Sequence, residues 1–151
     1  MSLVLSFALV LVWTVALSWV PAAFKVFNSS YAEKLKTDAN LMELSGWGAR
    51  AQRALLNHHE TLFAYLPVAV IAIVLGHLSP ESFTDPQSSQ LAVASSLYLI
   101  GRILHAICYI AAVPYARSVV WMVSTAAIVW MAVPFKRDIY AQIVPELLAN
   151  F

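Results

Sequence analysis

The chain has 151 residues, of which 61% are hydrophobic and 11% are charged. Soluble domains average about 45–50% apolar and about 25% charged residues, so this composition argues against a water-soluble protein. A net charge of +1 shows no basic excess for a nucleic acid partner, and a single cysteine excludes an intramolecular disulfide and a cysteine-rich metal site.

Four apolar segments follow one another along the chain, and each is long enough to cross a bilayer, which takes about 20 helical residues. The first lacks a basic segment before it and is longer than a signal-peptide core, so we do not expect it to be cleaved. We predict an all-α, integral membrane four-helix transmembrane bundle formed by one domain, 1–151. Its spans are expected at about residues 3–24, 54–75, 91–114 and 118–135.

Basic residues between the spans set the expected orientation, because short cytoplasmic loops collect Lys and Arg. The opposite side holds only Lys136 and Arg137. We therefore expect both termini outside and the first loop in the cytoplasm. In a bacterium the chain would lie in the inner membrane. The basic residues of the first loop and the third turn are Lys25, Lys34, Lys36, Arg50, Arg53 and Arg117.

Ionisable side chains within a membrane are costly, so they usually face a bundle interior or a wet cavity. Where the second span begins, Arg50, Arg53, Asn57 and Glu60 occur at i, i+3, i+7 and i+10. At about 100° per residue these side chains fall within an arc of about 80°. The spacing predicts one polar stripe along this helix.

The third span repeats the pattern, with Arg102, His105 and Tyr109 at i, i+3 and i+7 on one face. Because Arg102 is the only basic residue well inside another span, we predict that it pairs with Glu60. The alternative is that both stripes only hold the helices together, as polar residues often do in membrane proteins.

Three arginines at the expected cytoplasmic edge, Arg50, Arg53 and Arg117, favour a pocket over packing alone, because arginines hold carboxylates in bidentate geometry. The pattern predicts an anionic, water-soluble ligand that enters from the cytoplasm. The alternative is that these arginines snorkel to the membrane surface and only set the topology.

Two blocks of residues carry a resemblance to a known family. The run from Arg50 to Glu60 has the form RxxRAxxNxxE, and the block Arg102, His105 and Tyr109 is followed by Arg117 and Ser118. Together with four spans of matching length, these blocks resemble the MAPEG family, the membrane-associated proteins in eicosanoid and glutathione metabolism. The resemblance covers nearly the whole chain and suggests a bacterial-type member.

The resemblance implies a homotrimer that holds glutathione between neighbouring subunits near the cytoplasmic side. Glutathione is then the cosubstrate, whose thiolate attacks a lipophilic small molecule or reduces a peroxide, and membrane lipid surrounds the protein. Arg102 matches a position that supports the site through the glutamate, and Arg117 with Ser118 matches the position proposed to stabilise the thiolate. The positions that match glutathione-lining residues are Arg53, Asn57, Glu60, His105, Tyr109 and Arg117.

The chemistry agrees with the role implied for Arg117. A thiol reacts as its anion, and a positive group beside the sulfur raises the fraction of anion. Arginine stays protonated in proteins, so it stabilises the thiolate without removing the proton. Trp121, one helical turn further on, stands where several eicosanoid enzymes of the family have a tyrosine, and we include it in the expected site.

Two other functions stay open at this point. The family includes a non-enzymatic lipid-binding member, so a lipid-binding or scaffold trimer without catalysis is the main alternative to a transferase. A haem protein ligated by His105 and His58 is the other, because histidine is a common axial ligand. No further metal site is expected.

Overall fold

A computed structural model of the chain describes residues 2–28, 46–78 and 85–135. These residues form four helices: α1 (Leu3–Asn28), α3 (Gly46–Leu78), α4 (Asp85–Ile110) and α5 (Pro114–Ala132). Each helix is long and apolar enough to cross a membrane, which confirms the predicted four-helix membrane fold. Most of the first-loop lysines and both basic residues of the tail lie outside the described residues.

The helices differ from the predicted spans mainly at their ends. The second helix, α3, has 33 residues and begins at Gly46, well before residue 54. A helix of that length is about 50 Å long, more than the bilayer core of about 30 Å. Hydrophobicity marks only the apolar part of such a helix. As a consequence, Arg50 and Arg53 are helical residues and not part of a loop.

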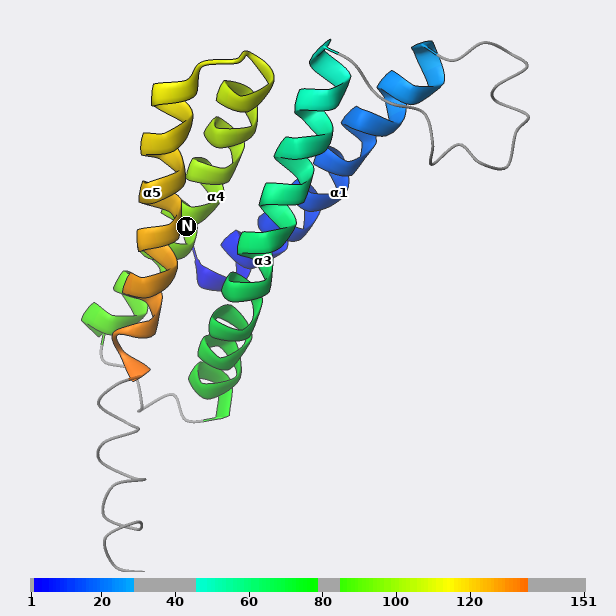
Figure 1. The fold of residues 1–151 in the computed structure, drawn as a ribbon. Helices are drawn as coiled ribbons and strands as arrows, with labels where there is room; N and C mark the ends of the chain where they lie inside the picture. Colours follow the sequence, from blue (N-terminus) through cyan, green and yellow to red (C-terminus); the bar gives the residue numbers. More distant parts are fainter. Residues whose placement is uncertain (1, 29–45, 79–84, 136–151) are drawn as a thin grey trace, which may run out of the picture.

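Helices α4 and α5 are antiparallel and form the closest helix pair of the bundle (Figure 1). Gly101 permits this approach, because a Cβ atom at that position would lie 2.7 Å from the Cβ of Ser124. Small residues at such crossings let two membrane helices approach closely. At the far end of the pair, the Gln90 side chain donates a 2.9 Å hydrogen bond to the carbonyl of Trp130.

Helix α1 crosses α3 obliquely and diverges from α4 and α5 towards its own C-terminal end (Figure 1). Val10 and Leu17 of this helix pack into the core and are fully buried. Its second half exposes apolar side chains, with Phe27 84% exposed. This exposure agrees with a lipid environment, which requires no burial of apolar side chains.

Polar residues connect the helices in the interior of the bundle. The Tyr65 and Tyr98 rings are buried and stack with centroids 4.2 Å apart, and the Tyr65 hydroxyl is 2.7 Å from Ser95 Oγ. Ser6 on α1 is 3.2 Å from Ser96 on α4. None of these contacts includes an arginine, so here polar residues hold helices together, as the packing interpretation predicts.

A tight turn between α4 and α5 sets the start of α5. The amide of Val113 donates to the carbonyl of Cys108 and the amide of Ala112 to that of Tyr109, which is the pairing of a Schellman motif. Ala112 has a positive φ of 60°, a conformation that glycine usually supplies. Pro114 then occupies the first turn of α5, where its missing amide hydrogen is no loss.

Candidate functional site

A cleft of about 450 Å³ lies between α3, α4 and α5, near the turn that joins α4 to α5. Six of the nine residues predicted for the site line it, contributed by all three helices. The lining residues are Asn57, His105, Tyr109, Arg117, Ser118, Trp121 and Met122. The structure therefore brings together residues that are up to 65 positions apart in sequence.

Three aromatic and cationic groups form one wall of this cleft. The guanidinium of Arg117 lies over the ring of Tyr109, 4.6 Å from its centroid. The Tyr109 ring meets His105 edge-on, with centroids 5.6 Å apart. The aromatic face attracts the guanidinium and keeps it at the cleft wall. Arg117 is half-buried and forms no ion pair with any residue of the described segments, so its charge is available to an anion.

Beneath this wall, Arg102 is buried and held by neutral groups. Its Nη2 donates to Oδ1 of Asn57 at 3.0 Å, and its Nε faces Nδ1 of His58 at 3.5 Å. Arg102 Nη1 and Nδ1 of His105 are buried and have no hydrogen-bond partner among the described residues. Buried polar atoms of this kind are usually satisfied by water or a ligand, so the site has unused hydrogen-bonding capacity.

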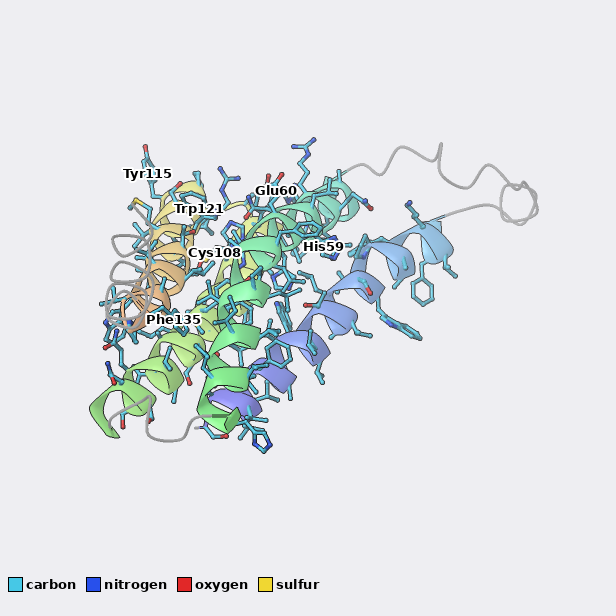
Figure 2. All side chains as sticks on the ribbon, turned by 90° about the horizontal axis from the view of Figure 1, so that it is seen from below. His59, Glu60, Cys108, Tyr115, Trp121 and Phe135 are labelled. Carbon is cyan, nitrogen blue, oxygen red and sulfur yellow. The ribbon has the colours of Figure 1, made fainter. Side chains whose placement is uncertain are left out.

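The predicted direct pair between Glu60 and Arg102 is wrong. Asn57 lies between the two residues: its Oδ1 accepts from Arg102, and its Nδ2 donates to Oε2 of Glu60 at 3.4 Å. Glu60 is exposed on α3 (Figure 2). The amide, one helical turn before the carboxylate, has both an acceptor and a donor and so connects groups that do not meet.

Arg53 and Glu60 do not line the cleft, and both side chains are exposed on α3. Arg50 has a structural role that the sequence pattern did not indicate. Its Nε donates at 2.8 Å to the carbonyl of Ile110, the last residue of α4, and its guanidinium lies 5.6 Å from the Trp47 ring centroid. A cation at a helix C-terminus satisfies a free carbonyl and complements the helix dipole.

Ser118 and Trp121 are exposed lining residues on α5 (Figure 2 labels Trp121). The Ser118 hydroxyl donates to the carbonyl of Pro114 at 3.1 Å, within its own helix. Its oxygen keeps lone pairs but its proton is already engaged. Beside them, Trp121 and Met122 give the cleft an apolar side that continues onto the outer surface of α5.

Two residues of this network were not predicted for the site: Thr14, and His58, which was considered only as a haem ligand. The Thr14 hydroxyl lies 2.8 Å from Nε2 of His58, and the other ring nitrogen faces Arg102. Both nitrogens of His58 are therefore engaged, which leaves none for haem ligation together with His105. Within the described segments, no group of three or more His, Cys, Asp and Glu side chains is arranged to hold a metal ion.

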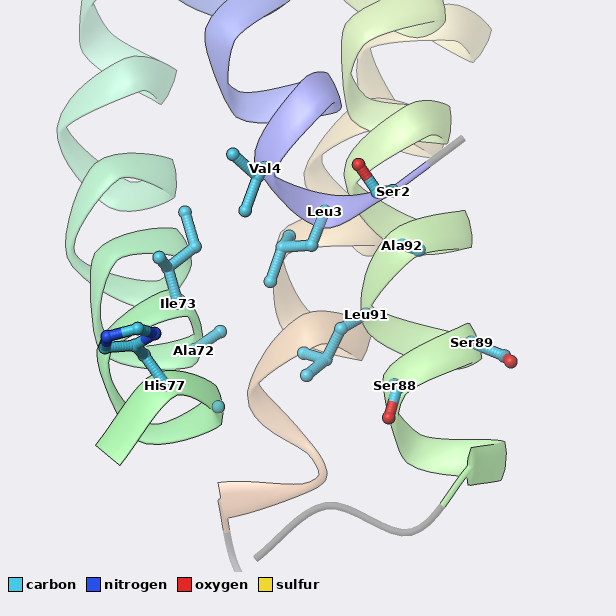
Figure 3. Close-up of a pocket in the computed structure, with 11 residues that line it drawn as sticks. Ser2, Leu3, Val4, Ala72, Ile73, His77, Ser88, Ser89, Leu91 and Ala92 are labelled. Carbon is cyan, nitrogen blue, oxygen red and sulfur yellow. The ribbon is translucent and has the colours of Figure 1, made fainter. Parts of the chain in front are cut away.

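A second cavity, of about 580 Å³, lies at the other end of the bundle, between the start of α1, the end of α3 and the start of α4 (Figure 3). Serine and aliphatic residues line most of it, and among the described residues His77 is the one ionisable residue that lines it. No arginine or lysine of the described segments lines it. This cavity therefore lacks the cations that a multiply charged anion requires.

The fold and the cleft define a class: a multi-pass helical membrane protein with a polar, arginine-bearing cleft at one end of its bundle. Comparison with known families is more specific, because the model of the MAPEG family matches residues 3–134. The chain belongs to the MAPEG family, as its two residue blocks predicted. No curated protein and no solved structure matches it.

Proposed function

We propose that this protein is a glutathione-dependent membrane transferase or peroxidase. The observation that carries the proposal is the cleft in which Arg117 is held over Tyr109, beside His105, Asn57 and Ser118. Membership of the MAPEG family supports the same ligand, because members of this family commonly use glutathione. The cation of the cleft has no ionic partner among the described residues. It can therefore bind a ligand that carries a thiol and two carboxylates.

In this proposal Arg117 stabilises the glutathione thiolate. A free thiol has a pKa of about 8.5, so a neighbouring guanidinium increases the anion at neutral pH. The thiolate sulfur then forms a bond to the electrophilic carbon of the acceptor and the leaving group departs with its electron pair. With a hydroperoxide, the thiolate sulfur bonds to the terminal oxygen as the O–O bond breaks, and the other oxygen leaves as the alcohol. The thiol of a second glutathione then displaces water from the sulfenic acid and forms the disulfide.

The polar stripe on α3 would bind the charged ends of the tripeptide. Arg53 provides an exposed guanidinium for a carboxylate, and Glu60 an exposed carboxylate for the amine. Asn57 connects this stripe to the cleft, because it lines the cleft and also contacts Glu60. Arg53 and Glu60 lie outside the cleft on the exposed side of α3, so a second surface is needed to enclose a ligand bound to them.

A second copy of this chain is the surface we propose. The hydrogen bond from Arg50 to Ile110 marks one end of the bundle, and Glu60 lies ten residues further along α3, about 15 Å away. An exposed carboxylate at that depth would face hydrocarbon in a monomer, at high cost. The family resemblance implies three copies. Native mass spectrometry in mild detergent should show a trimer, and a monomer that binds glutathione would contradict this arrangement.

The lipophilic partner would reach the cleft from the bilayer. Trp121 and Met122 are exposed, line the cleft and continue onto the lipid-facing surface of α5. A hydrophobic acceptor dissolved in the membrane meets this apolar side first, while glutathione approaches the cationic side.

Calorimetric titration of the detergent-purified protein with glutathione tests the proposal. Wild type should release binding heat, and Arg53→Ala and Glu60→Gln should each weaken the affinity. His59→Gln is the matched control, because His59 adjoins Glu60 but lies outside the polar stripe of α3. Absence of binding heat in wild type would overturn the enzyme proposal and leave the lipid-binding trimer, which the apolar second cavity favours, as the working account.

A further inference from the structure

One chain of buried and part-buried hydrogen bonds runs from α1 to the candidate site. It begins at Thr14, whose Oγ1 lies 2.8 Å from the carbonyl of Val10, one turn earlier in the same helix. The same oxygen lies 2.8 Å from Nε2 of His58 on α3. Nδ1 of His58 faces Nε of Arg102 on α4 at 3.5 Å. Three helices therefore meet in this chain of contacts.

The direction of these hydrogen bonds assigns the tautomer of His58. A hydroxyl has one proton, and that of Thr14 is donated to the Val10 carbonyl, which can only accept. Thr14 Oγ1 must therefore accept from Nε2, which carries the hydrogen. Nδ1 then has a free lone pair, and this pair faces the Nε–H of Arg102, which can only donate. Each donor in the chain meets an acceptor.

The tautomer determines how the guanidinium of Arg102 is held. With Nδ1 as an acceptor on one side and Asn57 Oδ1 as an acceptor on the other, Nε and Nη2 are both engaged. Nη1 is the guanidinium nitrogen that is buried without a partner in the described part of the chain. If His58 carried its hydrogen on Nδ1, it would present a donor to a donor, and the guanidinium would have to turn.

We propose that Thr14 and His58 are positioning residues for the ligand site: Thr14 holds His58 as its Nε2–H tautomer, and His58 fixes the Arg102 guanidinium so that Asn57 is correctly placed in the cleft. Neither residue touches the cleft, and both act through Arg102. This inference rests on the proposed function for its ligand, glutathione. All lining residues of the cleft come from α3, α4 and α5. The inference adds α1 as a helix that supports the site.

Two variants of Thr14 test the inference. Thr14→Val keeps the shape and removes the hydroxyl, and Thr14→Ser keeps the hydroxyl. Ser18→Ala is the matched control, because Ser18 lies one turn further along α1 and its hydroxyl donates only to its own helix, at the Val15 carbonyl. All proteins are compared as the full chain in detergent.

The first measurement does not depend on glutathione. Nitrogen-15 NMR of histidine-labelled protein, with the His58 signals assigned from their loss in His58→Gln, should show protonated Nε2 and unprotonated Nδ1. The same pattern should persist in Thr14→Ser and Ser18→Ala, and Thr14→Val should mix the two tautomers. A wild-type His58 protonated on Nδ1, or an unchanged pattern in Thr14→Val, would overturn the inference.

The second measurement is the glutathione dependence of binding and turnover. Thr14→Val should raise the glutathione Kd and KM about 3- to 10-fold, the effect of one lost hydrogen bond, with kcat within about twofold of wild type. Thr14→Ser and Ser18→Ala should match wild type. If Thr14→Val melts at a lower temperature but binds glutathione normally, Thr14 contributes only to stability. That result would overturn the positioning role but not the proposed function. A wild type that binds no glutathione would overturn the proposed function as well.

Discussion

Arg102 on α4 and Asn57 on α3 are joined by a 3.0 Å hydrogen bond from Nη2 to the amide oxygen, in the interior of the bundle. The pair connects the two polar stripes, and Asn57 extends the connection to Glu60. A buried guanidinium without such acceptors would be strongly destabilising. The bond therefore contributes to the stability of the helix pair and to the shape of the cleft.

Asn57→Leu should lower the free energy of unfolding by about 2 kcal/mol, because it leaves a buried charged donor without an acceptor. Thermal unfolding in detergent measures the change. The double variant Asn57→Leu with Arg102→Met removes the buried cation too and should recover part of the loss, since replacing both partners is less costly than orphaning one. A double variant that loses the full sum of the two single effects would contradict this account of the bond.

The face of the Tyr109 ring should contribute more than its hydroxyl to holding the Arg117 guanidinium in place. Tyr109→Leu removes the ring under the guanidinium and should weaken thiolate stabilisation about two- to fivefold, equivalent to about 0.5–1 kcal/mol. Tyr109→Phe keeps the ring and should stay near wild type. Thiolate absorbance at saturating glutathione gives the comparison, and equal losses in both variants would show that the hydroxyl is what counts.

Gly101→Ala should lower the free energy of unfolding by about 1–3 kcal/mol, because Gly101 and Ser124 are in close contact and the added methyl group overpacks the interface. The added Cβ would lie 2.7 Å from the Ser124 Cβ. Ser124→Gly in the same chain removes the opposing Cβ and should restore much of the stability. Melting temperatures of the two single variants and the double variant measure the coupling, and an additive result would argue against a direct clash.

Ala112→Gly should stabilise the protein by about 0.5–1 kcal/mol, because glycine adopts the left-handed conformation of this turn without the penalty of a Cβ. Ala112 has a φ of 60°. Ala111→Gly is the control, since Ala111 has a negative φ and gains nothing from glycine. The melting temperature should rise only for the first variant, and a fall would mean that the turn needs the methyl group.

The four helices were predictable because hydrophobicity is the main requirement for crossing a bilayer, and α1 and α5 contain few polar residues. The ends were less predictable. Helix α3 continues through Arg50 and Arg53, and helix formation outside hydrocarbon leaves no hydrophobic signal.

Much of the cleft was predictable from the spacing and family resemblance of Asn57, His105, Tyr109 and Arg117, since residues three, four or seven apart share a helix face. The contacts that polar residues make between helices were not predictable. Glu60 and Arg102 have opposite charges, and charge alone suggested a pair, but the neutral amide of Asn57 has the better position. Thr14 gave no signal beyond a single hydroxyl in an apolar segment, and its partner is set by the helix crossing.

Ultraviolet difference absorbance on adding glutathione is the most direct test of the central claim, that Arg117 stabilises a bound glutathione thiolate. Wild type should show a thiolate band at neutral pH, Arg117→Lys should keep part of it because a cation remains, and Arg117→Ala should lose it while staying folded. A wild-type protein that binds glutathione without a thiolate band, or a band of equal size in Arg117→Ala, would contradict the claim.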